Sequence, residues 1–340
     1  MPLRGAGPAG AGDARPDGAA PAYRPPWWLP GAHLQTIVPA RVLAVPRVAY
    51  ARERWDTPDG DFIDVDFALP QPADARAPLL VLFHGLEGDS SSHYARLVMD
   101  ACARRGWRGL VVHFRGCSGE ANRLPRAYHS GDTAEVDWIL ERIAVRWPQA
   151  RRFAVGVSLG GNVLAKWAGE QGPAAARRVV ALATVSAPFD LVAGGQALGE
   201  GFNRIYTAMF LRTLRPKALA KVARFPGLAD AARIDASRSI REFDDAFTAP
   251  VHGFDGVLDY WRRASAKPWL ATVALPMLAL NARNDPFVPG RSLPTAAEVS
   301  RFVTLDSPAQ GGHVGFGGRG PAGHAGYLAQ RVTAFLGEQL

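Results

Sequence analysis

Short runs of apolar residues alternate with segments of helical spacing over most of the chain. The apolar runs are Leu79–Phe83, Gly109–Phe114, Arg152–Gly156, Val179–Val185, Met277–Asn281 and Phe302–Leu305. The segments with helical spacing are Ser92–Arg105, Asp132–Arg146, Leu159–Glu170 and Gly323–Gly337. Continuous apolar runs of this length are typical of strands that are buried on both faces of a parallel sheet. The alternation therefore predicts an α/β protein with helices on both faces of a mostly parallel sheet.

Two segments depart from this alternation. Val48–Trp55 and Asp61–Ala68 alternate apolar and polar residues around a Thr-Pro-Asp-Gly turn, which predicts an N-terminal antiparallel hairpin at one edge of the sheet. From about residue 190 to 267 no buried strand is predicted, and the segment is helical and rich in aromatic residues. An insertion of this size between two strands is typical of a lid over a site, so we expect a helical lid here.

The N-terminal segment differs in composition from the rest. Residues 1–22 are mostly Ala, Gly, Pro, Asp and Arg without an apolar core, so we expect a disordered tail and not a secretory signal. The predicted α/β domain then spans residues 23–340. Pro25–Pro30, which contains Trp27 and Trp28, suits an extended arm that packs on the domain surface. No apolar run approaches the roughly 18 residues of a membrane helix, so we expect no integral membrane segment and a cytoplasmic location.

Composition narrows the classes of partner. The 340 residues carry 39 Lys and Arg against 31 Asp and Glu, a formal net charge of +8. The basic residues are scattered singly or in pairs, and four of them are Lys, so they form no phosphate-binding stripe and we expect no nucleic-acid partner. The two cysteines, Cys102 and Cys117, exclude a disulfide framework and show no zinc-ligand spacing. We expect neither a metal nor a cofactor.

The strongest chemical signal is the pattern Gly156-x-Ser158-x-Gly160, which follows an apolar run and opens a helical segment. A serine at a sharp strand-to-helix turn takes a strained backbone conformation, and the residues two before and two after it lie too close to neighbouring backbone for a Cβ atom. The position of the pattern therefore predicts a nucleophile elbow. The alternative is a glycine-rich turn with a capping serine. The glycine spacing does not match a dinucleotide-binding loop.

A serine nucleophile needs a base, and the base needs an acid that orients it. Asp285, in an Asn-Asp-Pro sequence, and His313, between glycines, each follow a predicted strand, in the order Ser158, Asp285, His313 that this kind of fold uses. Asp190 is a rival acid because it follows the preceding strand. His324 is a rival base, but it is expected to begin the C-terminal helix and to point away from the sheet edge.

Acyl transfer also requires donors to the developing oxyanion. We expect the backbone N–H of Leu159, directly after the nucleophile, and that of Leu86 in the His-Gly-Leu-Glu-Gly loop after the first parallel strand. His84 is expected to brace this loop. Cys117 has no adjacent base motif, and Ser118 has glycines at the wrong spacing for an elbow, so neither is predicted to be a nucleophile.

Several motifs together resemble the YheT-like branch of the α/β-hydrolase superfamily, from about residue 24 to the C-terminus. The motifs occupy residues 25–36, 84–88, 114–120, 128–131, 156–162, 201–204, 241–245, 248–254 and 284–289. The resemblance implies an α/β-hydrolase fold and a serine esterase with its triad on Ser158, Asp285 and His313. Animal members of the wider family carry an N-terminal membrane anchor that is not seen in this sequence, so their lipid-bilayer substrates do not transfer.

The expected activity is hydrolysis of carboxylic esters with short to medium acyl chains through an acyl-enzyme on Ser158. The partner is a small-molecule ester, and the sequence does not indicate an oligomeric state. Two alternatives stay open. The same triad serves an acyltransferase with an alcohol or thiol acceptor, and the same fold serves a binding scaffold without catalysis.

Overall fold

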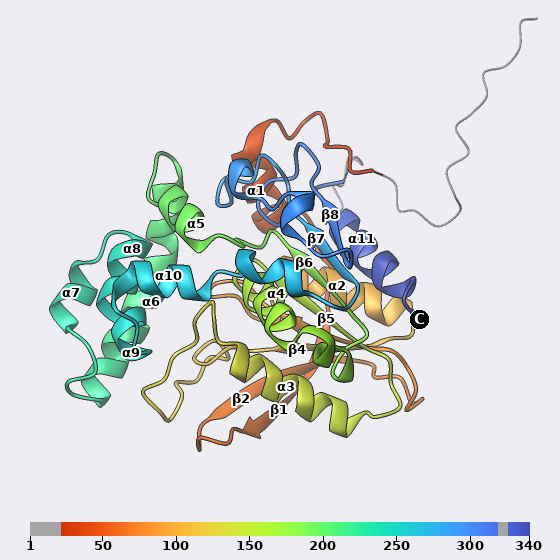
Figure 1. Ribbon diagram of the computed structural model, residues 1–340, viewed down its shortest axis with the longest axis horizontal. Coiled ribbons are helices and arrows are strands. Elements are labelled where there is room, and N and C mark those ends of the chain that lie inside the picture. The colour runs from red at the N-terminus through yellow and green to blue at the C-terminus, as the bar shows by residue number, and fades with distance from the viewer. Residues whose placement is uncertain (1–21, 319–325) are drawn as a thin grey trace, which may run out of the picture.

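The computed structural model describes residues 22–318 and 326–340, so residues 1–21 of the expected N-terminal tail lie outside the described part. Within the described residues the chain forms one eight-stranded sheet in the order β1-β2-β4-β3-β5-β6-β7-β8 (Figure 1). The strands are β1 (Ala49–Asp56), β2 (Phe62–Leu69), β3 (Leu79–Phe83), β4 (Arg108–Val112), β5 (Arg152–Val157), β6 (Ala181–Val185), β7 (Met277–Leu280) and β8 (Val303–Asp306). β1 and β2 form an antiparallel hairpin, β2 pairs antiparallel with β4, and the strands from β4 to β8 are parallel. The predicted α/β-hydrolase architecture is confirmed.

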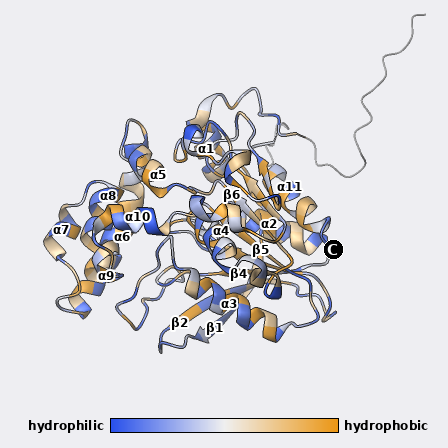
Figure 2. Cartoon of the chain, in the orientation of Figure 1, coloured by the Kyte–Doolittle hydropathy of each residue, from blue (hydrophilic) through white to orange (hydrophobic). Residues whose placement is uncertain are grey.

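The central strands have apolar side chains on both faces. Along β3, Leu79, Val81 and Phe83 contribute to one hydrophobic core, and the alternating Leu80 and Leu82 contribute to the other. A two-residue side-chain period places successive residues on opposite faces, so a continuous apolar run is what a strand covered on both sides requires. Figure 2 shows hydrophobic residues along the central strands and hydrophilic residues along the outlying loops.

Helices cover both faces of the sheet. On one face lie α3 (Thr133–Arg146) and α4 (Leu159–Gln171), and on the other lie α2 (His93–Arg104) and α11 (Gly326–Gly337). α2 and α11 pack against each other, as α3 and α4 do. Among the described residues, no helix combines the length and the apolar character needed to cross a membrane.

Six α-helices lie between β6 and β7 and form a separate bundle, here called the insertion (Figure 1). The helices are α5 (Leu191–Leu198), α6 (Asn203–Arg224), α7 (Ala231–Ala236), α8 (Ile240–Phe243), α9 (Ala249–Val251) and α10 (Gly256–Ala264). The insertion has its own hydrophobic core, which includes Leu211, Phe247 and Trp261. The core packs against Leu86, so the insertion touches the loop after β3.

The N-terminal region differs from the prediction. Residues 22–30 are without regular structure apart from a turn, as expected for an arm, but a helix, α1 (Gly31–Arg41), follows directly. The buried residues of α1 are Gln35, Thr36 and Pro39, not an apolar stripe. Because hydrophobic periodicity is the main signal for a helix in a sequence, a helix that buries polar side chains escapes that signal.

Candidate active site

Ser158 stands between the end of β5 and the start of α4, at the carboxyl edge of the sheet. Its backbone has φ 53° and ψ −118°, a region that residues other than glycine rarely adopt. A Cβ atom on Gly156 would lie 2.3 Å from the carbonyl oxygen of Gly160, and one on Gly160 would lie 2.4 Å from that of Phe83. Both glycines are therefore required by close backbone contacts, which is the geometry of a nucleophile elbow.

The structure brings the three residues of the predicted triad together. Nε2 of His313 lies 3.0 Å from Oγ of Ser158, and Nδ1 of His313 lies 2.8 Å from Oδ2 of Asp285. The other carboxylate oxygen of Asp285 accepts hydrogen bonds from the N–H groups of Phe287 and Val288, at 2.8 and 3.2 Å. The Asp285 side chain is fully buried, and its carboxylate is thus fixed against the imidazole.

The two rival residues have other positions. Asp190 lies at the N-terminal end of α5, where its side chain accepts a hydrogen bond of 3.0 Å from the N–H of Ala193. This is an ordinary helix cap. His324 belongs to residues 319–325, which lie outside the described part of the chain.

Leu86 and Leu159, whose backbone amides are predicted to bind an oxyanion, line the same cavity as Ser158 and His313. The loop that carries Leu86 packs on the nucleophile, because a Cβ atom on Gly85 would lie 3.2 Å from Cβ of Ser158. Leu159 is the first residue of α4, so its N–H has no partner inside the helix. Within the described part of the chain the N–H of Leu86 donates no hydrogen bond to another residue, so both amides are free to donate to a ligand oxygen.

His84 braces the loop that carries Leu86. Its Nδ1 lies 2.7 Å from the carbonyl oxygen of Gly85, and its Nε2 accepts a hydrogen bond of 3.1 Å from the N–H of Phe114. Burial lowers the pKa of His84 to about 3, so the ring is neutral at physiological pH. A neutral ring with both nitrogens bonded to backbone has a structural role.

Helix α1 supports the histidine loop, and sequence reasoning missed this. The Thr36 hydroxyl accepts a hydrogen bond of 2.9 Å from the N–H of His313. Oε1 of the fully buried Gln35 accepts hydrogen bonds from Nδ2 of Asn284 and from the N–H of Gly311, both at 2.9 Å. The two loops that carry the triad acid and base are therefore tied to one helix. The one feature of the sequence that could have indicated this support is the pair Gln35 and Thr36 within the motif at residues 25–36.

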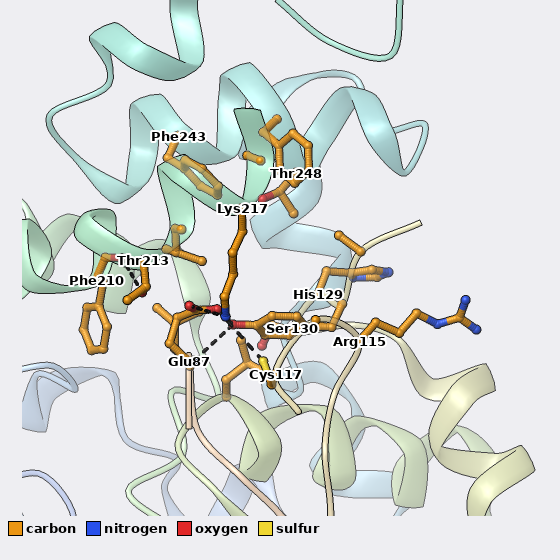
Figure 3. Close-up of a pocket in the computed structure, with 18 of the residues that line it drawn as sticks. Glu87, Arg115, Cys117, His129, Ser130, Phe210, Thr213, Lys217, Phe243 and Thr248 are labelled. Atoms are coloured by element: carbon orange, nitrogen blue, oxygen red, sulfur yellow. Dashed lines mark hydrogen bonds and ion pairs between the residues drawn. The ribbon is translucent and has the colours of Figure 1, made fainter. Parts of the chain in front are cut away.

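A cavity of about 880 Å³ opens from Ser158 and His313 toward the insertion. Its apolar walls include Leu191, Leu198, Phe210, Leu214, Phe243 and Phe247 of the insertion. Figure 3 shows the side of the cavity where Lys217 points from α6 toward Glu87. Residues 22–318 and 326–340 contain no group of three or more His, Cys, Asp and Glu side chains that could hold a metal ion.

Two other potential nucleophiles on the cavity wall lack an activating base. Burial raises the pKa of the Cys117 thiol to about 12, which keeps it protonated and weakly nucleophilic. The Ser130 hydroxyl accepts a hydrogen bond of 3.0 Å from Nδ2 of Asn162. Among the described residues neither side chain is bonded to a histidine, in contrast to Ser158.

A serine on a strand-to-helix elbow, bonded to a histidine and in turn to an aspartate at the carboxyl edge of a parallel sheet, is the site geometry of an α/β hydrolase. Residues 78–317 match the family model described as alpha/beta hydrolase fold, and the chain belongs to this family. It is 41% identical over 287 residues to the Escherichia coli (strain K12) protein named "Putative esterase YheT", with 84% of each chain covered. The resemblance to YheT-like proteins is thereby confirmed.

More distant relatives fit the same family. Human "Phospholipase ABHD3" is 29% identical over 301 residues, which cover 86% of this chain and 73% of that protein. Among solved structures, ferulic acid-bound Est1E from Butyrivibrio proteoclasticus matches with a TM-score of 0.53 and 16% identity, over 86% of this chain and 98% of that chain. At that identity the match shows the shared fold alone. The chain is therefore a member of a hydrolase family with esterase and lipase relatives.

Proposed function

We propose that this protein is a serine hydrolase that cleaves carboxylic esters with short to medium acyl chains through an acyl-enzyme on Ser158. The observation that carries the proposal is the unbroken hydrogen-bond chain from Asp285 through His313 to the Ser158 hydroxyl, which lies at the wall of a largely apolar cavity. The esterase name of the YheT relative supports the same reaction class.

The geometry supports a two-step reaction. The ester carbonyl oxygen binds against the N–H groups of Leu86 and Leu159, and Nε2 of His313 takes the proton as Ser158 Oγ attacks the carbonyl carbon. His313 then gives this proton to the leaving alcohol as the C–O bond breaks, and the acyl group stays on Ser158. His313 then deprotonates a water molecule that attacks the acyl carbon. The bond from this carbon to Ser158 Oγ breaks, Oγ takes the proton back from His313, and the carboxylic acid leaves. Asp285 holds the imidazole and stabilises its charged form.

The insertion supplies the substrate pocket in this proposal. Its apolar side chains face the cavity beside the nucleophile, so we assign it the role of a lid that binds the acyl chain. Such a pocket suits an apolar acyl group, because burial of each methylene contributes up to about 0.8 kcal/mol.

Labelling with a fluorophosphonate tests the nucleophile. We expect one adduct, on Ser158, and we expect Ser158→Ala to abolish both labelling and ester turnover. Ser118→Ala and Ser130→Ala serve as matched controls and should keep the label on Ser158. An adduct mass on Ser118 or Ser130 would falsify the assignment.

Competing alcohols in the ester assay reveal acyl transfer, since a transferase forms a new ester in place of the free acid.

A further inference from the structure

Glu87 occupies an unusual position directly after Leu86. Its backbone has φ 56°, the left-handed region that residues other than glycine rarely adopt. Its side chain is 7% exposed and lies on the wall of the cavity. A strained backbone at a loop persists only where surrounding contacts hold it. The contacts of Glu87 therefore help to hold the conformation of the loop that carries Leu86.

From the core of the protein, Tyr128 contacts Glu87. Its hydroxyl accepts a hydrogen bond of 3.0 Å from the N–H of Glu87 and donates one of 2.9 Å to Oε1 of the same residue. The Tyr128 ring stacks on Phe114, with 5.5 Å between ring centroids and 5° between planes. Burial raises the pKa of Tyr128 far above its ordinary value, so the phenol stays protonated and can donate. One rigid side chain thus holds both the backbone and the carboxylate of Glu87.

From the insertion, Lys217 contacts Glu87. Nζ of Lys217, on α6, lies 2.7 Å from Oε2 of Glu87, although the two residues are 130 positions apart. The Lys217 side chain is 46% exposed, and among the described residues Glu87 is its one hydrogen-bond partner (Figure 3). The carboxylate therefore receives a hydrogen bond from the core through one oxygen and an ion pair from the insertion through the other.

We propose that Glu87 is a positioning residue for the oxyanion site, and that Lys217 links this position to the insertion. When the insertion is seated, the ammonium group of Lys217 and the hydroxyl of Tyr128 hold the carboxylate from two sides and fix the N–H of Leu86 toward the ester oxygen. When α6 moves away, Glu87 loses its charged partner and the loop gains freedom. Closure of the insertion and completion of the oxyanion site are thus one event. This inference rests on the proposed esterase function.

Steady-state kinetics on a p-nitrophenyl ester test the link. Misplacement of one oxyanion donor costs less than its removal, which costs about 10²–10³ in kcat, so we expect Glu87→Gln and Lys217→Gln each to lower kcat about tenfold and to change KM less than about twofold. Lys217→Arg keeps the charge and should retain most of the activity. If the pair acts as a unit, the double variant is no slower than Glu87→Gln.

The matched control is Arg233→Gln. Arg233 forms an exposed ion pair with Asp245 inside the insertion and does not line the cavity. The Arg233→Gln variant should leave kcat unchanged. An equal loss in Arg233→Gln, or full activity in Glu87→Gln and Lys217→Gln with unchanged melting temperatures, overturns the proposal. If Glu87→Gln does not fold, Lys217→Gln still tests the proposal, because the Lys217 side chain is half-exposed and its loss should not prevent folding.

Two further readouts separate positioning from a general loss of structure. A trifluoromethyl ketone forms a tetrahedral oxyanion on the serine, so its inhibition constant should rise by the same factor by which kcat/KM falls. Salt screens a partly exposed ion pair, so 1 M KCl should lower kcat of the natural protein and leave that of Lys217→Gln unchanged. A rise in the inhibition constant without loss of kcat contradicts the proposal. If the proposed esterase function is wrong, the result is different from failure of the positioning role, because the natural protein then shows neither ester turnover nor labelling of Ser158.

Discussion

Asp285 uses both carboxylate oxygens, one toward His313 and one toward the backbone N–H groups of Phe287 and Val288. The Phe287 ring also packs on the imidazole, with 4.3 Å between centroids. At the residue scale the His313 imidazole is therefore held by a hydrogen bond at one edge and by an aromatic contact at its face. Such second contacts fix the tautomer and the orientation of a catalytic histidine.

Asp285→Asn tests the proposed role of the acid. We expect kcat for ester hydrolysis to fall by roughly 10⁴, as loss of the correct tautomer does in serine proteases, with folding retained. Asp190→Asn is the control, because Asp190 caps α5 and, among the described residues, has no hydrogen bond to the proposed triad. The opposite result, an inactive Asp190→Asn and an active Asp285→Asn, would mean that the acid is misassigned.

Asp244 gives a prediction about stability. Its oxygens accept hydrogen bonds from Oγ1 of Thr248 at 2.7 Å and Nε1 of Trp261 at 2.8 Å, yet burial raises its pKa to about 6. A carboxyl group whose pKa is raised by folding destabilises the protein as pH rises from its unfolded pKa through its folded pKa. The free energy of unfolding, relative to Asp244→Asn, should therefore fall by at most about 3 kcal/mol between pH 4 and 7.

Urea denaturation at several pH values measures this difference. The neighbouring Asp245 provides the control, since a hydrogen bond from the N–H of Val257 lowers its pKa. Asp245→Asn should show no such fall. A constant difference between the natural protein and Asp244→Asn from pH 4 to 7 would show that this carboxyl titrates at its ordinary pKa.

At the scale of elements, α1 connects the N-terminal arm to the loops of the triad. A Cβ atom on Gly315 would lie 1.8 Å from the carbonyl oxygen of Gln35, so the glycines around His313 allow the loop to pack directly on this helix. The glycine-rich loop thus gains its position from close backbone contact. This helix buries polar side chains because its partners are polar groups of the two loops, namely the N–H groups of Gly311 and His313 and Nδ2 of Asn284.

Thr36→Val tests this support of the histidine loop. The Thr36 hydroxyl donates a hydrogen bond to the carbonyl of Ala32 and accepts one from the N–H of His313. In α11 the Thr333 hydroxyl donates the equivalent hydrogen bond to the carbonyl of Ala329, away from the site. We expect Thr36→Val to lower kcat several-fold by freeing the loop, since one neutral hydrogen bond contributes about 1 kcal/mol. Thr333→Val, the matched control, should keep kcat. Equal activities of the two variants would show that α1 is not needed to place His313.

At the scale of the whole molecule, the sheet carries the proposed triad and the insertion carries most of the apolar cavity wall. α6 joins the two parts, because Nζ of Lys221 donates to the carbonyls of Leu124 and Arg126 at 2.7 and 2.9 Å. Lys217 adds the contact with the loop that carries Leu86. In the proposed function, the cavity of about 880 Å³ between these parts limits the length of the acyl chain.

A panel of p-nitrophenyl esters tests the pocket. We expect kcat/KM to rise from acetyl to about hexanoyl or octanoyl, since each buried methylene contributes up to about 0.8 kcal/mol, and then to fall as the pocket fills. Phe210 and Leu214 line the cavity from α6, so Leu214→Trp should move the optimum to shorter chains. A steady decline from acetyl onward would instead mean that the substrates are acetyl esters.

The sequence alone determined the strands of the sheet, the elbow at Ser158 and the order of the triad residues. These features depend on local patterns: an apolar run long enough for a buried strand, glycines where a Cβ atom cannot fit, and polar residues directly after strands. Parallel strands bring their carboxyl ends to one edge, so residues such as Asp285 and His313 can be assigned to one site before their distances are known.

Only the tertiary structure decided which side chains support that site. Gln35 meets Gly311 across 276 positions, and Glu87 meets Lys217 across 130. No periodicity marks such pairs, because a polar side chain that faces backbone or a distant charge looks like a surface residue in the sequence. The shape of the cavity likewise depends on how the insertion packs on the sheet. Local patterns indicate which residues are candidates for the reaction, and the packing of distant segments determines how these residues are held.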